Sequence, residues 1–408
     1  MMATLAQDRL ASGTLDMTRA ELYRDDLWQE PFRQLRAQAP VYHCTESDFG
    51  PYWSISAYKP IVEVESLPDI YSSAAGITVA DLLVDDVRLP MFIAMDRPKH
   101  TGQRRTIAPA FTPSEMTRMR ADVVRRTGEL LDTLPVGEPF DWVDKVSIEL
   151  TTQMLALLFG FPWEERRKLT FWSDWAGDIE IARDPARKQE RLTHLYDCAA
   201  AFRQLWNDRL GQPPTPDLIS MMLHSDAMAE MDEHEFLGNL ILLIVGGNDT
   251  TRNTMSAYAW GLEQFPEERA KLEADPGLIP NAAQEIIRWQ TPLAHMRRTA
   301  TRDAELYGQQ IREGDKLVLW YLSANRDETL FEDGDRIIVD RANARRHLAF
   351  GHGIHRCVGA RLAELQVGVL MEEMAKRRLR PNVLAEPDRV PACFVHGYRS
   401  MQVELSRY

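Results

Sequence analysis

Ten residues near the carboxyl end of the chain decide its fold: Phe350–Gly359 reads Phe-Gly-His-Gly-Ile-His-Arg-Cys-Val-Gly. Glycine adopts positive φ without steric cost and lets a flat ligand approach the backbone. A helical pattern of apolar residues begins near Ala360, so Cys357 stands just before a helix. The dipole and unpaired N–H groups at a helix start lower the pKa of a thiol. The stretch predicts a tight loop that stabilises a Cys357 thiolate; the alternative is a small buried cysteine without chemistry.

This stretch resembles the haem-binding loop of the cytochrome P-450 superfamily, whose signature is Phe, Gly, Cys and Gly at offsets of zero, three, seven and nine. Phe350, Gly353, Cys357 and Gly359 match every position. The resemblance implies that Cys357 is the axial ligand of haem b iron, that Phe350 shields the sulfur and that His355 contacts a propionate. It also implies a mainly α single-domain P-450 fold with small β-sheets, with the haem between a long central helix and the cysteine loop.

The composition bounds the kind of protein. At 408 residues the chain could form two or three domains. It has no Ser/Gly linker, repeat or low-complexity run, so we expect one domain over residues 1–408. A net charge of −13 argues against a nucleic-acid surface, which needs clustered Lys and Arg. The longest apolar run, Leu240–Val245, is too short to span a membrane.

The cysteines indicate neither a zinc site nor a disulfide framework. Cys44, Cys198, Cys357 and Cys393 lie far apart, without the paired spacing of metal ligands. The first 24 residues are charged and hold no apolar run of signal-peptide length. We therefore expect a protein of the reducing cytoplasm.

A long central helix is predicted over residues 232–264, and its middle departs from ordinary helix composition. Gly246 and Gly247 precede Asp249 and Thr250, where a buried helix favours Ala or Leu. The glycines leave room for a flat cofactor, and the Thr250 hydroxyl can bond the carbonyl of Gly246, opening a groove for oxygen. The resemblance makes Asp249 and Thr250 the acid–alcohol pair that delivers protons during oxygen activation.

A second helix is expected to start at Asp96, as its cap, with Pro98 in its first turn. His100 and Arg104 are four residues apart and share a face. The resemblance makes this pair a propionate-binding site, although a solvated helix face explains the same spacing. Arg298 is expected at another propionate-binding position, with Arg297 as its competitor.

A Glu-x-x-Arg pair is predicted on a helix over residues 281–290. Glu285 and Arg288 form this pair, and Arg341, in the stretch before the cysteine loop, is the third partner that the resemblance implies. A buried ion-pair network contributes little net stability but is costly to break singly. We interpret the triad as structural.

Other elements are predicted from local patterns. Residues 19–39 suggest one helix ended by Pro40, and Trp53–Ser56 alternates like a half-buried strand. The loop over Ser72–Arg88 is a candidate substrate-facing segment. The apolar pattern over residues 392–405 indicates a hairpin, with a tip near Phe394 that could reach the substrate.

The ordered motifs identify the chain as a cytochrome P-450 monooxygenase that inserts one oxygen atom from O2 into an unactivated C–H bond. No flavin or nicotinamide motif is present, so electrons are expected from a ferredoxin and its NAD(P)H-dependent reductase. The stretches 92–96, 244–253 and 291–300 resemble bacterial terminal hydroxylases of alkanes and fatty acids. Alternatives are a hydroxylase of terpenoid or steroid skeletons, or a non-catalytic haem-based sensor. The apolar pocket is expected to contain Leu242, Val245, Leu293, Met296 and Phe394.

Overall fold

The computed structural model describes residues 12–81, 86–178, 181 and 184–408. It contains two compact units. The first unit combines the described residues of Met1–Val84 with Gly261–Cys357 and Pro387–Arg399. The second combines those of Asp85–Trp260 with Val358–Glu386 and Ser400–Tyr408. The mainly helical fold with small sheets that the sequence predicted is confirmed.

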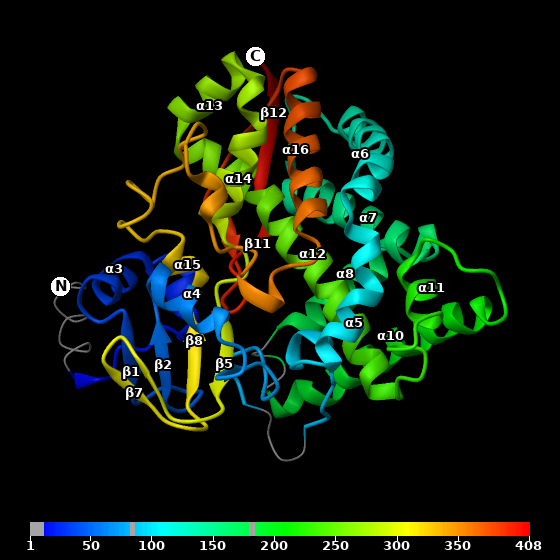
Figure 1. The fold of residues 1–408 in the computed structure, drawn as a ribbon. Coiled ribbons are helices and arrows are strands. Elements are labelled where there is room, and N and C mark those ends of the chain that lie inside the picture. The colour runs from blue at the N-terminus through cyan, green and yellow to red at the C-terminus, as the bar shows by residue number, and fades with distance from the viewer. Residues whose placement is uncertain (1–11, 82–85, 179–180, 182–183) are drawn as a thin grey trace. The chain divides into compact units, whose positions relative to one another are not determined.

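The first unit contains a mixed sheet, visible in Figure 1. Its strand order is β1 (Val41–Cys44), β2 (Tyr52–Ile55), β8 (Lys316–Leu319), β5 (Met296–Ala300) and β3 (Tyr71–Ser72). The β2–β8 pair is parallel and the other pairs are antiparallel. This sheet supports β5, the strand that carries both candidate propionate-binding arginines.

The strand predicted near Trp53 is more deeply buried than its alternating pattern suggested. All four residues of β2 are buried, including Ser54. The Ser54 hydroxyl accepts a 3.0 Å hydrogen bond from the Trp320 indole N–H, which allows a polar residue inside the sheet. The half-buried prediction is therefore wrong, because a tertiary hydrogen bond replaces water on that face.

Residues 19–39 form two helices rather than the predicted one. α2 (Ala20–Arg24) ends at Asp25, and α3 (Gln29–Gln38) begins after Trp28. Asp26 between them has φ of 53°, a left-handed conformation that short polar side chains tolerate. Burial of the Trp28 ring at 2% exposure holds the turn in place.

Further helices of the first unit are α4 (Tyr58–Ser66), α13 (Pro266–Ala274), α14 (Ile279–Gln290) and α15 (Tyr321–Ala324). In the last segment of the first unit, β10 (Asp388–Arg389) pairs with β11 (Tyr398–Ser400). The predicted hairpin is thus shifted toward the amino terminus, and Phe394 lies in the loop between its strands. The loop predicted over Ser72–Arg88 includes residues 82–85, which lie outside the described residues.

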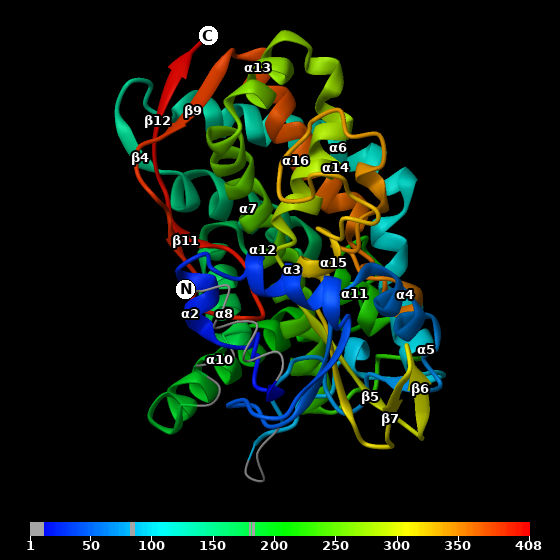
Figure 2. The ribbon, with the colours of Figure 1, turned by 90° about the vertical axis from the view of Figure 1, so that its left-hand side faces the viewer.

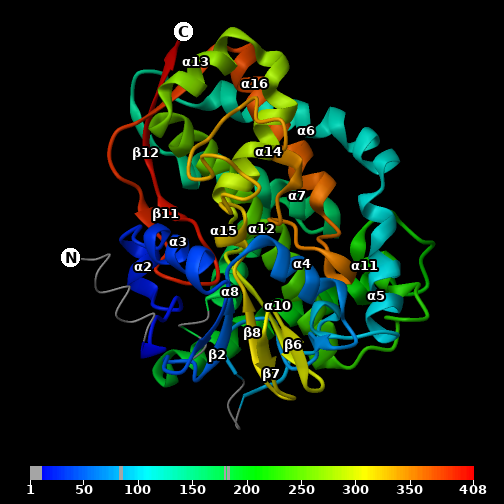
Figure 3. The ribbon, with the colours of Figure 1, turned by 60° about the vertical axis from the view of Figure 1, so that its left-hand side comes forward.

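The second unit is built around α12 (Glu233–Gln264), which belongs to it as far as Trp260. The helices that share its apolar core are α5 (Lys99–Ile107), α6 (Pro113–Thr133), α7 (Glu149–Phe159), α8 (Arg167–Gly177), α10 (Pro185–Arg209), α11 (Leu218–Leu223) and α16 (Ala360–Lys376). α6 and α16 pack side by side (Figure 3). Leu240 and Ile244 on α12 are completely buried in this core, so the side of α12 that carries them faces the core.

A small antiparallel sheet completes the second unit. Its order is β4 (Pro139–Asp141), β12 (Gln402–Arg407) and β9 (Leu379–Val383), as Figure 2 shows. Within the part of the chain that the structure describes, no helix has both the length and the apolar composition needed to cross a membrane.

Candidate haem-thiolate site

The cysteine loop of the first unit is closed by its own backbone. The amide of Cys357 donates a 2.8 Å hydrogen bond to the carbonyl of Phe350. Gly351 and Gly353 have φ of 67° and 65°, values that other residues adopt at a cost. Cys357 is an exposed cysteine, and α16 begins three residues later, at Ala360. The loop therefore presents a single thiol just before a helix.

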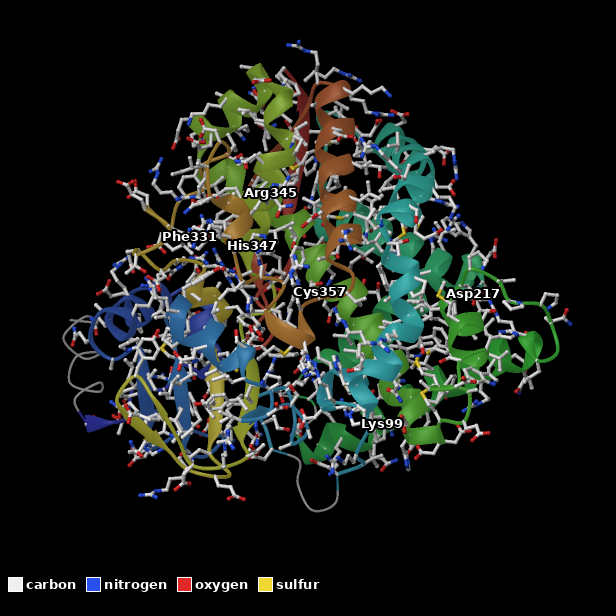
Figure 4. All side chains as sticks on the ribbon, in the orientation of Figure 1. Lys99, Asp217, Phe331, Arg345, His347 and Cys357 are labelled. Carbon is white, nitrogen blue, oxygen red and sulfur yellow. The ribbon has the colours of Figure 1, made fainter. Side chains whose placement is uncertain are left out.

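The aromatic ring of Phe350 lies near the side chains of His347 and Arg356. Its centroid is 5.3 Å from the ring of His347 and 5.9 Å from the guanidinium carbon of Arg356. His347 and Cys357 can be followed on the orange ribbon in Figure 4. Burial, with nearby Arg288, Arg356 and Arg345, lowers the pKa of His347 to about 3, so this imidazole is neutral.

Glu285, Arg288 and Arg341 meet in one buried ion-pair network. The Glu285 carboxylate accepts hydrogen bonds from Arg288 Nε at 2.8 Å and from Arg341 Nε at 2.9 Å. Arg288 also donates to the carbonyls of Asn325 and Gly334. The side chains of Glu285 and Arg288 are 0% exposed. The network ties α14 to the stretch that precedes the cysteine loop.

The two candidate propionate-binding arginines on β5 point to different partners. Arg297 pairs with Asp81 and donates to the carbonyl of Ala80. Arg298 donates from Nη2 to Glu65 Oε1 at 2.9 Å. Glu65 in turn accepts from the backbone amide of His352 at 2.9 Å, so Arg298 is the one that shares a partner with the cysteine loop.

The middle of α12 has one accessible side. Leu242, Val245 and Thr250 are partly exposed and Gly246 is exposed, whereas their neighbours Leu243 and Ile244 are buried. A side-chain carbon built on Gly246 would meet nothing within 4 Å. These four positions, at i, i+3, i+4 and i+8, form a stripe that we call the open stripe. The Thr250 hydroxyl donates to the Gly246 carbonyl at 2.9 Å, as predicted.

Asp249 is held by hydrogen bonds inside the second unit. Its Oδ1 accepts from Ser173 Oγ at 2.9 Å and from Asn248 Nδ2 at 3.0 Å. Arg252 Nη2 lies 3.2 Å from Asp249 and 2.7 Å from Asp174, so its charge is shared by two carboxylates. Burial raises the pKa of Asp249, with Arg252 opposing the change. The carboxyl group is therefore easier to protonate than an exposed aspartate.

His100 and Arg104 lie on α5, but the helix does not begin as expected. It starts at Lys99 with Pro98 at the cap position and no side-chain cap, so the prediction of an Asp96 cap is wrong. The Asp96 backbone carbonyl, rather than its side chain, accepts the His100 N–H at 3.0 Å. Burial lowers the pKa of His100, and the positive charge of Arg104 lowers it further.

The candidate pocket residues occur in two local groups. Leu293, Met296 and Phe394 belong to the first unit, where Ala294 N–H donates to the Phe394 carbonyl at 2.9 Å and Leu293 pairs with Val395. Leu242 and Val245 lie one turn apart on α12 of the second unit. Each group is apolar.

His295 is a buried residue whose role the sequence did not reveal. Its Nδ1 donates to the carbonyl of Cys393 at 2.8 Å, and its Nε2 accepts from the amide of Val79 at 3.2 Å. Burial lowers its pKa to about 4, so both bonds are made by a neutral ring. His295 thereby joins β5 to the Phe394 loop.

The donor set fits a haem better than a bare metal ion. Among residues 12–81, 86–178, 181 and 184–408, no group of three or more His, Cys, Asp or Glu side chains is placed to hold a metal. Cys357 instead offers one exposed cysteine in a glycine-containing loop of the first unit. A planar macrocycle that supplies its own nitrogen ligands would need only such a single sulfur donor from the protein.

Comparison with known proteins agrees with this donor set. A sequence model of the family described as Cytochrome P450 matches residues 278–377. The chain is 34% identical over 407 residues to linalool 8-monooxygenase of Pseudomonas putida, covering 96% of this chain and 98% of that protein. It is 32% identical over 400 residues to a methyl-branched lipid omega-hydroxylase of Mycobacterium tuberculosis, covering 94% and 92%.

Solved structures give the same result. CYP153D17 from Sphingomonas sp. PAMC 26605 matches with a TM-score of 0.93 and 74% identity, over 96% of this chain and 99% of that one. Cytochrome P450-153 from Novosphingobium aromaticivorans matches with a TM-score of 0.92 and 57% identity, over 96% and 99%. The chain therefore belongs to the cytochrome P450 family and is a haem-dependent monooxygenase.

Proposed function

We propose that the protein hydroxylates linear alkanes or fatty acids at or near the terminal methyl. The observation that carries this proposal is the open stripe of α12, where apolar Leu242 and Val245 precede Gly246 and Thr250. The stripe has no charged or amide side chain, and the Thr250 hydroxyl is already bonded to the Gly246 carbonyl, so shape must orient an aliphatic chain. Leu293, Met296 and Phe394 are proposed as further apolar lining.

The cofactor is proposed to be haem b, held by the Cys357 thiolate. When bound, a thiolate-ligated haem supplies the chemistry that inserts oxygen from O2 into an unactivated C–H bond. Phe350 is proposed to shield the sulfur. The propionates are assigned to four residues: His100, Arg104, Arg298 and His355. Arg298 is preferred over Arg297, because Arg298 shares its partner Glu65 with the His352 amide of the cysteine loop.

Asp249 and Thr250 are proposed to hold and move the protons. Thr250 Oγ1 can exchange its bond to the Gly246 carbonyl for a bond to a reacting oxygen. The Asp249 carboxyl can hold a proton because burial raises its pKa, and Ser173 fixes its orientation. Asp249 and Thr250 belong to the second unit and Cys357 belongs to the first. Because the proposed reaction needs all three residues, we propose that residues 1–408 act as one functional domain.

Electrons are proposed to come from a ferredoxin and its NAD(P)H-dependent reductase. Arg345 and Arg346 are exposed basic residues of the first unit and follow Arg341 closely in sequence. We propose them as docking cations for the electron carrier. Such cations attract an acidic electron carrier at long range.

The names of the relatives support attack at a chain end. Carbon 8 of linalool and the omega carbon of a lipid are both chain-end carbons. Linalool is also a terpenoid, which favours a second candidate function: hydroxylation of a terpenoid or steroid skeleton. Substrate tests must therefore include both classes.

Product analysis decides between these candidates. Octane, dodecanoic acid and linalool are incubated separately with the protein, ferredoxin, reductase and NADH, and products are resolved by gas chromatography. The proposal predicts mainly terminal alcohols from the linear chains. Mainly subterminal alcohols, or turnover of linalool alone, would overturn it.

A matched pair of variants tests the open stripe. Val245→Ala should widen the approach and move oxidation inward along the chain, because the neighbouring methylenes can then reach the reacting group. Ile244→Val changes the adjacent, fully buried position and should leave the ratio of terminal to subterminal alcohol unchanged.

A further inference from the structure

Glu65 on α4 carries a carboxylate that is buried within the first unit, with its side chain 1% exposed. Its Oε1 accepts hydrogen bonds from Arg298 Nη2 at 2.9 Å and from the Tyr321 hydroxyl at 2.6 Å. Its Oε2 accepts from the backbone amide of His352 at 2.9 Å. These three neighbours are all donors that favour the ionised carboxylate, and they oppose burial, which raises the pKa of Glu65.

The cysteine loop rests directly on Glu65. His352 is five residues before Cys357, and a side-chain carbon at Gly353 would come within 2.2 Å of the Glu65 backbone carbonyl. One at Gly351 would lie 3.7 Å from Glu65 Oε1. Gly353 therefore allows close approach to Glu65 as well as positive φ, whereas Gly351 is needed for positive φ alone.

The same carboxylate fixes Arg298. The guanidinium donates from Nη1 to the carbonyl of Arg297 at 2.8 Å and from Nη2 to Glu65. These two bonds lock the arginine in one orientation. Glu65 also offsets its positive charge in a buried site, where charge acts over longer range than in water.

We infer that Glu65 is a positioning residue with two effects. It holds the cysteine loop in place, and its negative charge offsets the positive charge of Arg298. Through these effects Glu65 tunes the reduction potential of the haem. This inference rests on the proposed roles of Cys357 and Arg298. Neither the Glu65 carboxylate nor its neighbours is required to transfer a proton.

Two substitutions separate the two effects. Glu65→Gln keeps the reach and one acceptor oxygen but removes the negative charge. Glu65→Asp keeps the charge but withdraws the carboxylate by one methylene from the His352 amide. Glu63→Gln, at an exposed position on the same helix, is the matched control.

Two measurements on the haem-loaded protein read these effects. Spectroelectrochemical titration gives the midpoint potential, and hydrogen exchange gives the protection of amides in residues 350–357. Glu65→Gln should raise the potential, because losing a negative charge favours addition of an electron. Glu65→Asp should hold the potential near that of the unmodified protein and increase amide exchange about tenfold, roughly the loss of one hydrogen bond.

The inference fails if Glu65→Gln shifts the potential no more than Glu63→Gln, or if Glu65→Asp leaves loop protection unchanged. Should Glu65→Gln not fold, the exchange result for Glu65→Asp decides alone. Failure of the proposed function looks different, because it appears as mainly subterminal alcohols or turnover of linalool alone, whereas a wrong assignment of the Cys357 ligand would remove the spectrum of a thiolate-ligated haem from the unmodified protein.

Discussion

The Thr250 hydroxyl already donates a hydrogen bond within its own helix, α12. The bond to the Gly246 carbonyl keeps the donor satisfied until another acceptor arrives. The next hydroxyl along the helix, Thr254, makes the same type of bond to the Thr250 carbonyl but is buried at 4% exposure. Exposure therefore distinguishes the two threonines, and for this reason the proton-delivery role is proposed for Thr250 and not for Thr254.

Thr250→Ala should leave substrate affinity nearly unchanged while less reductant ends in product, because proton delivery is separate from pocket shape. The measurement is the ratio of alcohol formed to NADH consumed, with peroxide assayed alongside. Thr250→Ser restores a hydroxyl and should recover most of the ratio. An unchanged ratio in Thr250→Ala would remove Thr250 from the mechanism.

The candidate site residues stand out in the sequence, but the residues that contact them do not. Cys357, Asp249 and Thr250 sit in local patterns that break ordinary helix or loop composition. Ser173 contacts Asp249 across 76 positions of sequence, and Glu65 contacts Arg298 across 233. Neither support has a local signature, because only the folded chain brings it to its partner.

At the scale of the element, Glu285 on α14 holds two arginines at once. The Glu285 carboxylate is bonded to both Arg288 and Arg341, and backbone carbonyls take up further guanidinium donors. Removing its charge leaves two buried cations without their counterion, an arrangement that water cannot relieve.

Glu285→Gln should lower the free energy of unfolding by about 3–5 kcal/mol and reduce the haem-to-protein ratio after expression. Glu267→Gln is the control, because Glu267 pairs with Arg336 at the surface, with both side chains about half exposed. Exposed pairs contribute only about 0–1 kcal/mol. Normal stability and haem content with lost turnover would instead indicate a catalytic role for Glu285.

Local patterns predicted long elements better than their interruptions. The central helix was expected at residues 232–264 and is observed at Glu233–Gln264, because its apolar period before Gly246 is long enough to predict the helix despite the unusual middle. The break between α2 and α3 was missed, since Asp26 adopts a left-handed conformation that its type permits but does not require. Burial of Trp28, a tertiary effect, selects it.

At the scale of the whole molecule, buried neutral histidines make stability depend on pH. Burial lowers the pKa of His295 and of His396 to about 4, and that of His347 to about 3. In the unfolded chain each histidine titrates near 6.5. Below that pH the unfolded state binds protons that the folded state excludes, so stability falls as pH decreases.

His347→Gln should make the free energy of unfolding less dependent on pH between about 6 and 4, by about 1.4 kcal/mol per pH unit. Urea unfolding at several pH values measures this slope. His43→Gln, at an exposed position of β1, should leave it unchanged. The assignment is contradicted if both variants keep the slope of the unmodified protein.

The most direct test of the haem-thiolate account is the absorption spectrum of the reduced protein under carbon monoxide. Cys357 is exposed at the loop, whereas Cys44 is buried and its pKa is raised to about 11 by burial. The account predicts a strongly red-shifted Soret band that Cys44→Ser retains and Cys357→His abolishes. Survival of that band in Cys357→His would contradict the assignment of Cys357 as the haem ligand.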